Sequence, residues 1–429
     1  MLPLMLVLLA CAPPEDEAPP PDTDVETDVA DAANCKLPPE GRCEDNTLIT
    51  CVDGERERTE CGLAECRLGD DGAYACVDPG MQGNPEPSDV DDLADLLAGT
   101  VVSNASGVAA FRVSIHGETS FLISASVPDD RLVWLTGLYR PDGSEVQIDD
   151  PYLNLAVFAD VASVFAWPSR AEDGPLIDGD WTVALQVTNA QGYAARNTDV
   201  AIDVLTKTDD DPAHGQLRVA LVWAGVSSVD PDAGAAVDHA IDAWRRLYER
   251  HDLELVVEQY TAASAPELMP MPQQDGALWA SLSASTGPVD VMVVLCDDFA
   301  EGAGDELLGI TGQVPSTTTA GPRAGVLVSL ARHAGRDGRF DRDETSFLAT
   351  TIGHEVGHFM GLFHPVELTW EDYDPLGDTP ECEGERQCVS RLGGNLMFPA
   401  TTCWTQGCED TLDLTDDQVA VTQLYPGTL

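Results

Sequence analysis

Three of the chain's eight histidines, His354, His358 and His364, fall within eleven residues, and Glu355 directly follows the first of them. If this segment is helical, His354 and His358 lie one turn apart on one face, so both imidazoles can bind the same metal ion. Zinc accepts such nitrogen ligands in a roughly tetrahedral shell. Glu355 is rotated away from that face, where it can reach a water beside the metal and act as a general base. The spacing therefore predicts a zinc site that activates water.

The third histidine follows a glycine. Gly361 accepts a positive φ and lets the chain leave the helix in a sharp turn, which would return His364 as the third ligand. Two histidines at this spacing are, by themselves, equally compatible with a buried pair that binds no metal. The glycine and the third histidine at these offsets favour the metal site. An apolar row on the opposite side of the helix is expected to pack on the core: Leu348, Ile352, Val356 and Met360.

The pattern His354-Glu355-x-x-His358-x-x-Gly361-x-x-His364 resembles the signature of the metzincin zinc metalloproteases. Metzincins also have a methionine in a tight turn beneath the zinc, and Met397 within Gly393–Pro399 is similar to it. The resemblance implies a strand-and-helix subdomain, a zinc helix and a short irregular C-terminal subdomain within residues 215–429. It also implies an edge strand that pairs with an extended peptide substrate. The candidates for that strand are Gly325, Val326, Leu327 and Val328.

Within the metzincins the chain most resembles the pappalysin, or cytophagalysin, branch. The resemblance rests on the segment Gly377–Cys382, on the cysteines of the C-terminal part, and on Leu414–Gln418, which would begin a last helix. Two prolines depart from a single family pattern, because Pro365 resembles the serralysins and Pro399 follows two residues after Met397. Astacins and serralysins have a tyrosine near the metal at the place where this chain has Pro399. No tyrosine ligand to the metal is therefore expected here.

Calcium is a second candidate cofactor besides one catalytic Zn²⁺, because relatives in the pappalysin branch bind it near the active site. Residues 337–344 place several carboxylates at short spacing: Asp337, Asp341, Asp343 and Glu344. Their order does not fit an EF-hand loop. We interpret the segment as a loop whose Asp341 or Asp343 caps the zinc helix, with a calcium site as the alternative.

The predicted function is a zinc-dependent endopeptidase that hydrolyses protein or peptide substrates. Zinc would lower the pKa of a water molecule and polarise the scissile carbonyl. Glu355 would take the proton of that water and return it to the leaving amine. Two alternatives remain open: a non-catalytic surface adhesion protein built on a protease scaffold, and a zinc amidase that acts on cell-wall peptides.

The first ten residues are an apolar run that is too short to cross a membrane as a mature helix and is typical of a signal peptide. The run ends in Leu8-Leu9-Ala10-Cys11, which resembles a bacterial lipoprotein box, so Cys11 is the candidate for lipidation. No Lys or Arg precedes the run, and a plain secretory signal is the alternative. We therefore expect an exported protein that is either secreted or anchored to the outer membrane or cell surface by lipid.

The other cysteines support export. Eleven remain after Cys11, and they form a cluster of six within residues 35–76, a cluster of four within residues 382–408, and the single Cys296. Even clusters in an exported chain predict disulfides, whose pairing the spacing does not reveal. Because Cys296 ends the apolar run Val291–Cys296, we expect it to be a buried free thiol.

The charge is strongly acidic: 22 Lys and Arg stand against 75 Asp and Glu, which gives a net charge of −53. Nucleic acids and anionic membrane surfaces would repel such a chain, so neither is an expected partner. Contact with a membrane is expected through the lipid anchor alone. The sequence makes no prediction about the oligomeric state.

Length, composition and strand patterns predict a multidomain chain with a Cys-rich module and an all-β sandwich, followed by an α/β (α+β) domain that the resemblance implies is a metzincin-like catalytic domain. The sandwich shows no chemistry and is interpreted as a spacer, with substrate or surface binding as the alternative. The expected order is a lipoprotein signal peptide (1–11), an acidic disordered tether (12–34), a disulfide-rich module (35–77), a linker (78–97), the sandwich (98–206), a linker (207–214) and the peptidase domain (215–429).

Alternating apolar residues predict individual strands and helices. Helices are expected over a segment with Val237, Ile241, Trp244 and Tyr248, and from about Asp343 to Gly361. The five histidines outside the metal motif are expected to be ordinary surface or polar-face residues: His116, His214, His239, His251 and His333. The predicted strands are Phe111–Ile115, Thr119–Ser126, Leu132–Thr136, Trp181–Val187, Leu217–Trp223, Leu253–Val257, Val289–Leu295 and Gly325–Leu330.

Overall fold

The structure is a computed structural model, and its chain divides into two compact units, one within Ala12–Pro85 and the other within Glu86–Leu429. Cys11 and the predicted signal peptide and acidic tether lie outside the described residues, as does most of the linker at 78–97. The structure describes residues 42–44, 47–52, 55–60, 65–68, 74–77, 97–147, 159–208, 214–226, 231–262, 264–266, 268–272, 274–286, 289–300, 307–318, 321, 323–335, 337–400, 402–403 and 407–428.

The first unit contains short antiparallel strands. Strands β1 (Arg42–Glu44), β2 (Thr47–Val52) and β3 (Glu55–Glu60) form one sheet, and β4 (Glu65–Leu68) pairs with β5 (Tyr74–Val77). Cys66 lies opposite Cys76 in the second pair. The disulfide framework expected for this module stays a prediction.

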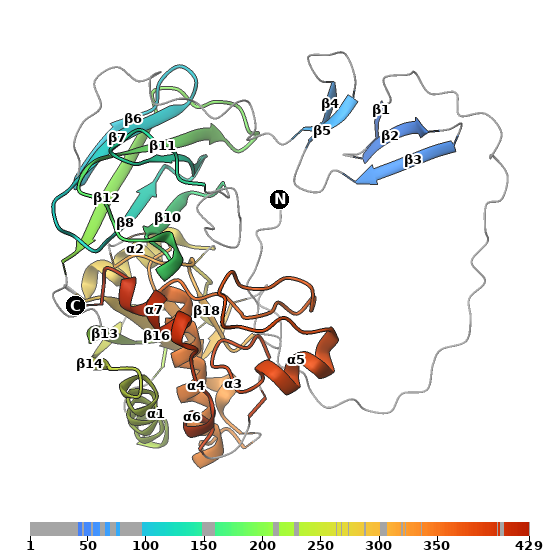
Figure 1. The fold of residues 1–429 in the computed structure, drawn as a ribbon. Helices are drawn as coiled ribbons and strands as arrows, with labels where there is room; N and C mark the ends of the chain where they lie inside the picture. Colours follow the sequence, from blue (N-terminus) through green and yellow to red (C-terminus); the bar gives the residue numbers. More distant parts are fainter. Residues whose placement is uncertain are drawn as a thin grey trace. The chain divides into compact units, whose positions relative to one another are not determined.

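Two sheets form a sandwich at the start of the second unit (Figure 1). Their inward side chains share one core that includes Phe111, Phe121 and Trp181, as alternation along the strands requires. All four strands predicted in this region are confirmed. One sheet has the order β10 (Ala162–Trp167), β8 (Ser120–Ser126), β12 (Asp199–Lys207) and β6 (Ala98–Val102), and the other has the order β7 (Val108–Ile115), β11 (Gly179–Asn189) and β9 (Arg131–Tyr139).

A five-stranded sheet forms the centre of the rest of the second unit. Its order is β14 (Leu253–Ala262), β13 (Gly215–Ala224), β16 (Val291–Cys296), β19 (Val326–Ser329) and β18 (Gly309–Thr311). The first four strands are parallel, and β18 is antiparallel to β19. A separate pair is formed by β15 (Leu268–Met269) and β17 (Asp298–Phe299).

The sheet order corrects the predicted edge strand. Val326, Leu327 and Val328 lie in β19, which pairs with β16 on one side and β18 on the other, and Gly325 precedes the strand. The edge is therefore β18 on this side of the sheet. The continuous apolar run of β19 is typical of a buried strand that has neighbours on both sides.

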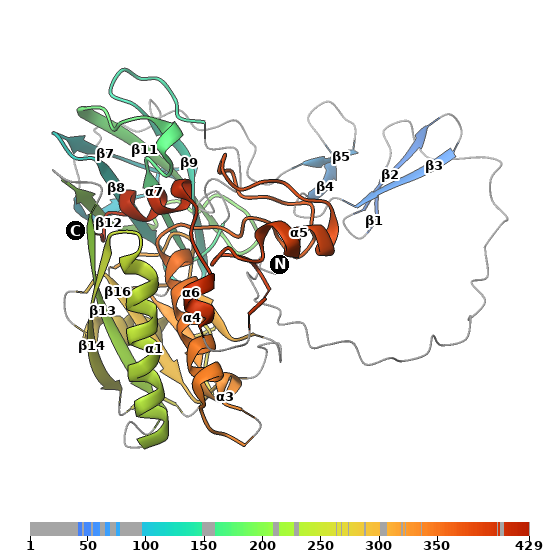
Figure 2. The same ribbon diagram turned by 60° about the horizontal axis from the view of Figure 1, so that its bottom comes forward.

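Helices cover both faces of this sheet. The predicted helices are confirmed as α1 (Pro231–Glu249) and α4 (Arg342–Phe359), which lie side by side on one face (Figure 2). Trp279 of α2 (Gly276–Ser285) packs in the core on the other face. The remaining helices are α3 (Leu330–His333), α5 (Gly384–Leu392), α6 (Cys408–Thr411) and α7 (Asp416–Leu424).

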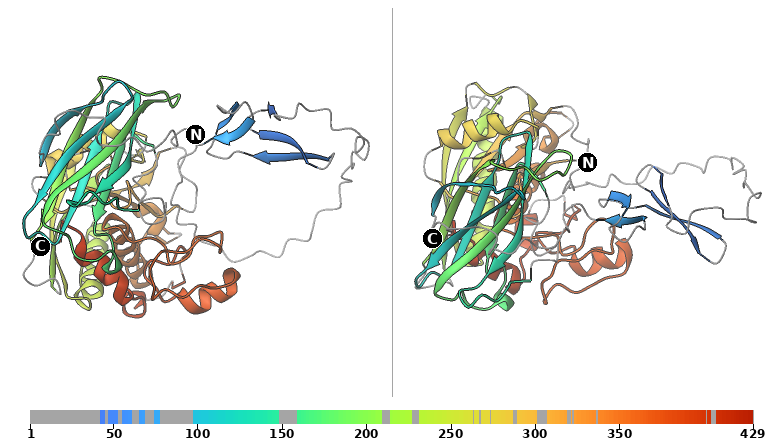
Figure 3. Two further views of the ribbon diagram at one scale, coloured as in Figure 1. Left: turned by 45° about the horizontal axis from the view of Figure 1, so that its top comes forward. Right: turned by 90° about the horizontal axis from the view of Figure 1, so that it is seen from above.

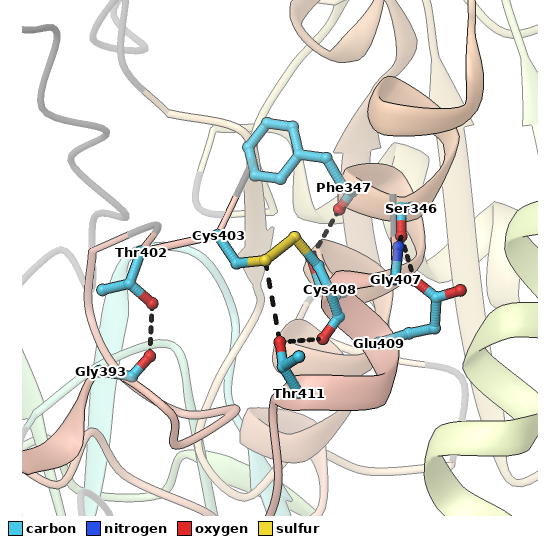
Figure 4. The surroundings of a disulfide bond; sticks show 10 residues. Ser346, Phe347, Gly393, Thr402, Cys403, Gly407, Cys408, Glu409 and Thr411 are labelled. Atoms are coloured by element: carbon cyan, nitrogen blue, oxygen red, sulfur yellow. Dashed lines mark hydrogen bonds between the residues drawn. A yellow bond between two sulfur atoms is a disulfide. The ribbon is translucent and has the colours of Figure 1, made fainter. Parts of the chain in front are cut away.

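The C-terminal cysteines form two disulfides, Cys382–Cys388 and Cys403–Cys408, which confirms the prediction and supplies its pairing. Figure 4 shows the second beside the first turns of α4, where the Gly407 amide donates to Ser346 Oγ at 3.1 Å. Cys296 is a buried free thiol, as expected, and burial raises its pKa. No helix among the described residues is long and apolar enough to cross a membrane.

Candidate metal centre

Helix α4 begins and ends where the sequence predicts. The Asp341 carboxylate accepts from the amides of Asp343 and Glu344, and Glu344 accepts from the Asp341 amide, which forms a capping box. At the other end the helix stops at Phe359, and Gly361 adopts a φ of +107°. This backbone conformation strains any residue with a side chain, so Gly361 makes the turn toward His364.

The turn brings three imidazoles together. His364 Nε2 lies 3.1 Å from His358 Nε2 and 3.3 Å from His354 Nε2. Two nitrogens bound at about 2.0–2.1 Å to one tetrahedral zinc lie about 3.3–3.4 Å apart, so the spacing fits a shared ion. Within the part of the chain that the structure describes, these histidines are the one group of three or more His, Cys, Asp or Glu residues whose ligand atoms all lie within 4.8 Å of one another.

Each imidazole has an acceptor at its other nitrogen. His354 Nδ1 lies 2.8 Å from the Leu396 carbonyl oxygen, and His358 Nδ1 lies 2.6 Å from the Leu362 carbonyl oxygen. Those carbonyls can only accept, so both Nδ1 atoms carry the proton and both Nε2 lone pairs point to the shared centre. Burial, followed by the neighbouring imidazoles, lowers the pKa of His354 to about 3 and that of His358 well below its usual value. Neutral imidazole is the form that binds a metal.

His364 Nδ1 lies 3.0 Å from Glu367 Oε2, a contact that the sequence analysis did not find. A carboxylate at this position orients the ring and makes the imidazole a stronger ligand, and losing such a partner typically costs 10- to 100-fold in metal affinity. We expect Glu367→Gln to bind zinc about tenfold more weakly and to keep its maximal activity at saturating zinc.

Competition with a fluorescent zinc chelator would measure the effect of Glu367→Gln, and Glu371→Gln, an exposed residue nearby, is the matched control. Equal zinc affinity of the wild type and Glu367→Gln would contradict a role for Glu367 in holding His364.

Glu355 lies on α4 beside the histidines and is 2% exposed. The Thr311 hydroxyl lies 3.0 Å from Glu355 Oε2 and 2.6 Å from the Glu355 carbonyl oxygen. Burial raises the pKa of Glu355 to about 8, against the lowering by Thr311. A dication held by neutral imidazoles would favour the ionised carboxylate that a general base requires.

The edge strand β18 supplies the surroundings of Glu355. A Cβ added at Gly309 would lie 2.8 Å from Glu355 Cγ, so the strand approaches the carboxylate closely because residue 309 has no side chain. Gly309 and Thr311 were missed by the sequence analysis, because a three-residue strand carries too little periodicity to identify it.

Met397 packs against α4, the helix that carries His354 and His358. A Cβ added at Gly357 would lie 2.5 Å from Met397 Sδ. The helix can therefore approach the sulfur this closely only because residue 357 is glycine. The turn is fixed by Asn395, whose Oδ1 accepts from the Met397 amide at 2.8 Å and whose Nδ2 donates to Gln418 Oε1 at 2.7 Å. The same turn offers the Leu396 carbonyl to His354.

His333 was expected to be a surface or polar-face residue, and this expectation is wrong. The residue is 2% exposed, with Nδ1 2.6 Å from the Ser329 carbonyl oxygen and Nε2 2.9 Å from Thr351 Oγ1. It connects the end of β19 to the metal helix, and burial lowers its pKa to about 4. His333 does not belong to the three-histidine centre.

The segment at 337–344 caps α4, as we interpreted it, because Asp341 and Glu344 form the capping box. The calcium alternative for this segment stays a prediction. A different buried carboxylate lies in the segment after the metal motif. Asp374 is 8% exposed; its Oδ1 accepts from the Leu376 amide at 3.2 Å and from the Thr379 hydroxyl. Asp374 Oδ2 is buried with no hydrogen-bond partner among the described residues, and burial raises the pKa of the carboxyl to about 7.

No protein-family model matches the chain, and neither does any curated protein. The solved structure of metalloproteinase-II from Bacteroides fragilis resembles it at a TM-score of 0.30 and 12% identity. The alignment covers 56% of this chain and 64% of that one, somewhat less than two thirds of its length.

Proposed function

We propose that the chain is a zinc-dependent endopeptidase of the metzincin type. The observation that carries the proposal is the convergence of three Nε2 atoms at spacings of 3.1 and 3.3 Å with a buried carboxylate beside them. The methionine turn beneath the helix supports the family assignment. The pappalysin branch is proposed on the sequence resemblance together with the two C-terminal disulfides.

When bound by His354, His358 and His364, zinc would supply a Lewis acid that lowers the pKa of water and polarises a carbonyl. Glu355 accepts the proton of the attacking water at a carboxylate oxygen and delivers it to the leaving amine. Thr311 holds the carboxylate in place through its hydroxyl. The carbonyl partners of the Nδ1 atoms keep the rings from rotating, so the groups need no rearrangement for the reaction.

A protein or peptide substrate would bind as an extended strand along β18. This strand is antiparallel to β19 and has a free edge on its other side among the described strands. Main-chain pairing along such an edge accepts many sequences, because the hydrogen bonds are made by the backbone. The bound peptide would run past Gly309 and Thr311, which lie beside Glu355. Its scissile bond would then lie near the histidines.

Export is proposed on the apolar N-terminal run and on Cys11 as the lipidated residue. The two C-terminal disulfides support an oxidising compartment, because such bonds persist outside the cytoplasm. A lipid on Cys11 would be the one attachment to a membrane, and the net charge of −53 argues against nucleic acid as a partner.

A substrate panel separates this function from its two alternatives. The purified full chain is incubated with denatured casein, with internally quenched peptides and with cell-wall muropeptides, and the products are identified by mass spectrometry. An endopeptidase cleaves casein and the peptides at internal bonds. Release of peptide stems from muropeptides alone would identify an amidase, and intact substrates throughout, with zinc bound, would identify an adhesion protein.

We further propose that calcium binds at Asp374. The buried and unpartnered Oδ2 atom supports this, together with the neighbouring Asp378 and Asp417, whose charges also raise the pKa of Asp374. Oxygen ligands from carboxylates and from Thr379 are of the kind that Ca²⁺ prefers. A divalent cation would compensate the charge of a carboxylate that has no other partner for this oxygen.

Calcium is therefore expected to stabilise the fold. At about 100 times its dissociation constant, a ligand specific for the folded state adds about 2.7 kcal/mol to the free energy of unfolding. Thermal unfolding of the zinc-loaded protein in calcium and in a calcium-selective chelator measures this difference, and Asp374→Asn should remove it. Asp337→Asn should retain it. An identical Tm of the wild type in both buffers would contradict the proposal.

A further inference from the structure

The sandwich packs directly on the part of the chain that carries the metal centre (Figure 3). Leu122 of β8 and Val164 of β10 belong to the same core cluster as the residues of α1, α4 and the five-stranded sheet. Lys207 is 2% exposed and donates from Nζ to the Gln423 carbonyl at 2.6 Å, near the C-terminal end of α7. A buried lysine needs a hydrogen-bond partner at a fixed position, and the partner of Lys207 lies outside the sandwich. This contact therefore argues against a sandwich that is only a spacer.

One contact across this boundary is an ion pair between the buried Arg323 and the partly exposed Asp160. Arg323 is 7% exposed, and its Nε and Nη2 donate to the two carboxylate oxygens of Asp160 at 3.0 and 2.7 Å. Its Nη1 donates to the Pro272 carbonyl at 2.8 Å. Two parallel bonds from one guanidinium fix direction as well as distance. Asp160 is itself held in the sandwich by main-chain hydrogen bonds with Val133 of β9.

Arg323 lies in the segment that connects β18 to β19, so its contacts can affect the position of the edge strand β18. The Arg323 carbonyl accepts from Ser316 Oγ at 3.0 Å, and it would lie 2.1 Å from a Cβ at Gly312. Gly312 directly follows Thr311, the last residue of β18 and the partner of Glu355. The ion pair is therefore separated from the catalytic carboxylate by a short and closely packed stretch of chain.

The other end of the edge strand is held without the sandwich. Arg332 of α3 donates to the Leu307 carbonyl at 2.8 Å, just before β18 begins, and pairs with Asp298 of β17 at 2.6 Å. At the Arg323 end a cavity of about 190 Å³ lies between the sandwich and the connecting segment, with Ala162, Thr317 and Arg323 among its lining residues. Hydrogen bonds also hold the connecting segment, since the Ser316 amide donates to the Phe359 carbonyl and the Ser316 carbonyl accepts from the Tyr425 hydroxyl. The ion pair with Asp160 is the salt bridge that joins this end of the segment to the sandwich.

We infer that the sandwich is a positioning domain for the substrate-binding edge strand, and that Asp160 and Arg323 are the positioning residues through which it acts. The inference rests on the proposed endopeptidase function. The pair touches neither the metal ligands nor Glu355. Breaking it should therefore leave zinc binding and the chemical step largely intact and should weaken the pairing of β18 with an extended peptide.

The test compares Asp160→Asn, Arg323→Gln and the double variant with the wild type, all as full chains, on an internally quenched peptide long enough to span β18. We expect KM to rise about tenfold and kcat to change less than about threefold, because uniform binding is lost rather than transition-state stabilisation. The double variant should be no worse than either single variant, since both changes break the same contact. Arg112→Gln and Asp180→Asn, which remove an exposed ion pair within the sandwich, should match the wild type.

A purely structural role gives a different pattern. It would lower Tm and the fraction of zinc-loaded protein, and kcat would fall in proportion while KM stayed unchanged. Arg323→Lys provides a milder variant that keeps the charge but loses the two parallel bonds, and it should also raise KM. Unchanged KM in Asp160→Asn, Arg323→Gln and Arg323→Lys with an active wild type would overturn the inference alone. A wild type that cleaves nothing would overturn the proposed function with it.

Discussion

Replacing Glu355 by alanine is expected to abolish cleavage without removing the metal. Loss of a positioned general base typically costs about 10²- to 10⁴-fold in rate. Glu355 does not belong to the group of side chains that can share the ion, so the variant should retain zinc as the wild type does. The measurement is kcat on a quenched peptide, with zinc content determined on the same preparation.

The same variant should not unfold more easily than the wild type. Burial raises the pKa of Glu355 to about 8, so in the absence of metal the carboxyl must take up a proton when the chain folds at neutral pH, which costs stability. Removing it relieves that cost, which is the usual relation between a functional group and the stability of its site. Glu355→Gln keeps the shape of the side chain and should be equally inactive. More than a tenth of wild-type activity in either variant would exclude Glu355 as the base.

Replacing His358 by alanine is expected to remove both metal and activity. His358 Nε2 lies 3.1 Å from His364 Nε2, and the remaining pair of histidines offers zinc too few ligands for a closed shell. Zinc affinity should fall by more than the roughly 100-fold upper range for changes of supporting residues. Metal analysis after gel filtration, together with the peptide assay, measures both effects.

His333→Gln is the matched control for His358→Ala. His333 is also a buried histidine that contacts α4, through Thr351, but its Nε2 is used by that hydroxyl. The variant should retain about one zinc per chain, as the wild type does, since no ligand is changed. Loss of zinc in His333→Gln, or full zinc retention in His358→Ala, would contradict the assigned ligand set.

The metal helix could be predicted from sequence because every signal in it is local. Asp341 and Glu344 are three residues apart and form the capping box, and Gly361 marks the exit turn. The three histidines fall within the same short stretch, so helical geometry alone places two of them. Met397 was predicted through the resemblance of Gly393–Pro399 to the metzincin turn.

The parts that could not be predicted depend on distant pairs or on very short elements. Strand β18 has three residues, and its position beside β19 appears only when the sheet is assembled. Asp160 and Arg323 are 163 residues apart, and neither segment contains a sequence pattern that would predict their pairing. Burial of His333 likewise results from packing between α3 and α4, and the sequence around it carries no apolar periodicity long enough to show it.

One measurement tests the central claim most directly. Zinc content and cleavage of casein are determined on the purified full chain as isolated, after removal of metal with a chelator, and after zinc is added back. The account predicts about one zinc per chain, cleavage that is lost with the metal, and recovery when zinc returns. Cleavage that persists in metal-free protein, or a fully zinc-loaded chain that leaves casein and peptides intact, would contradict it.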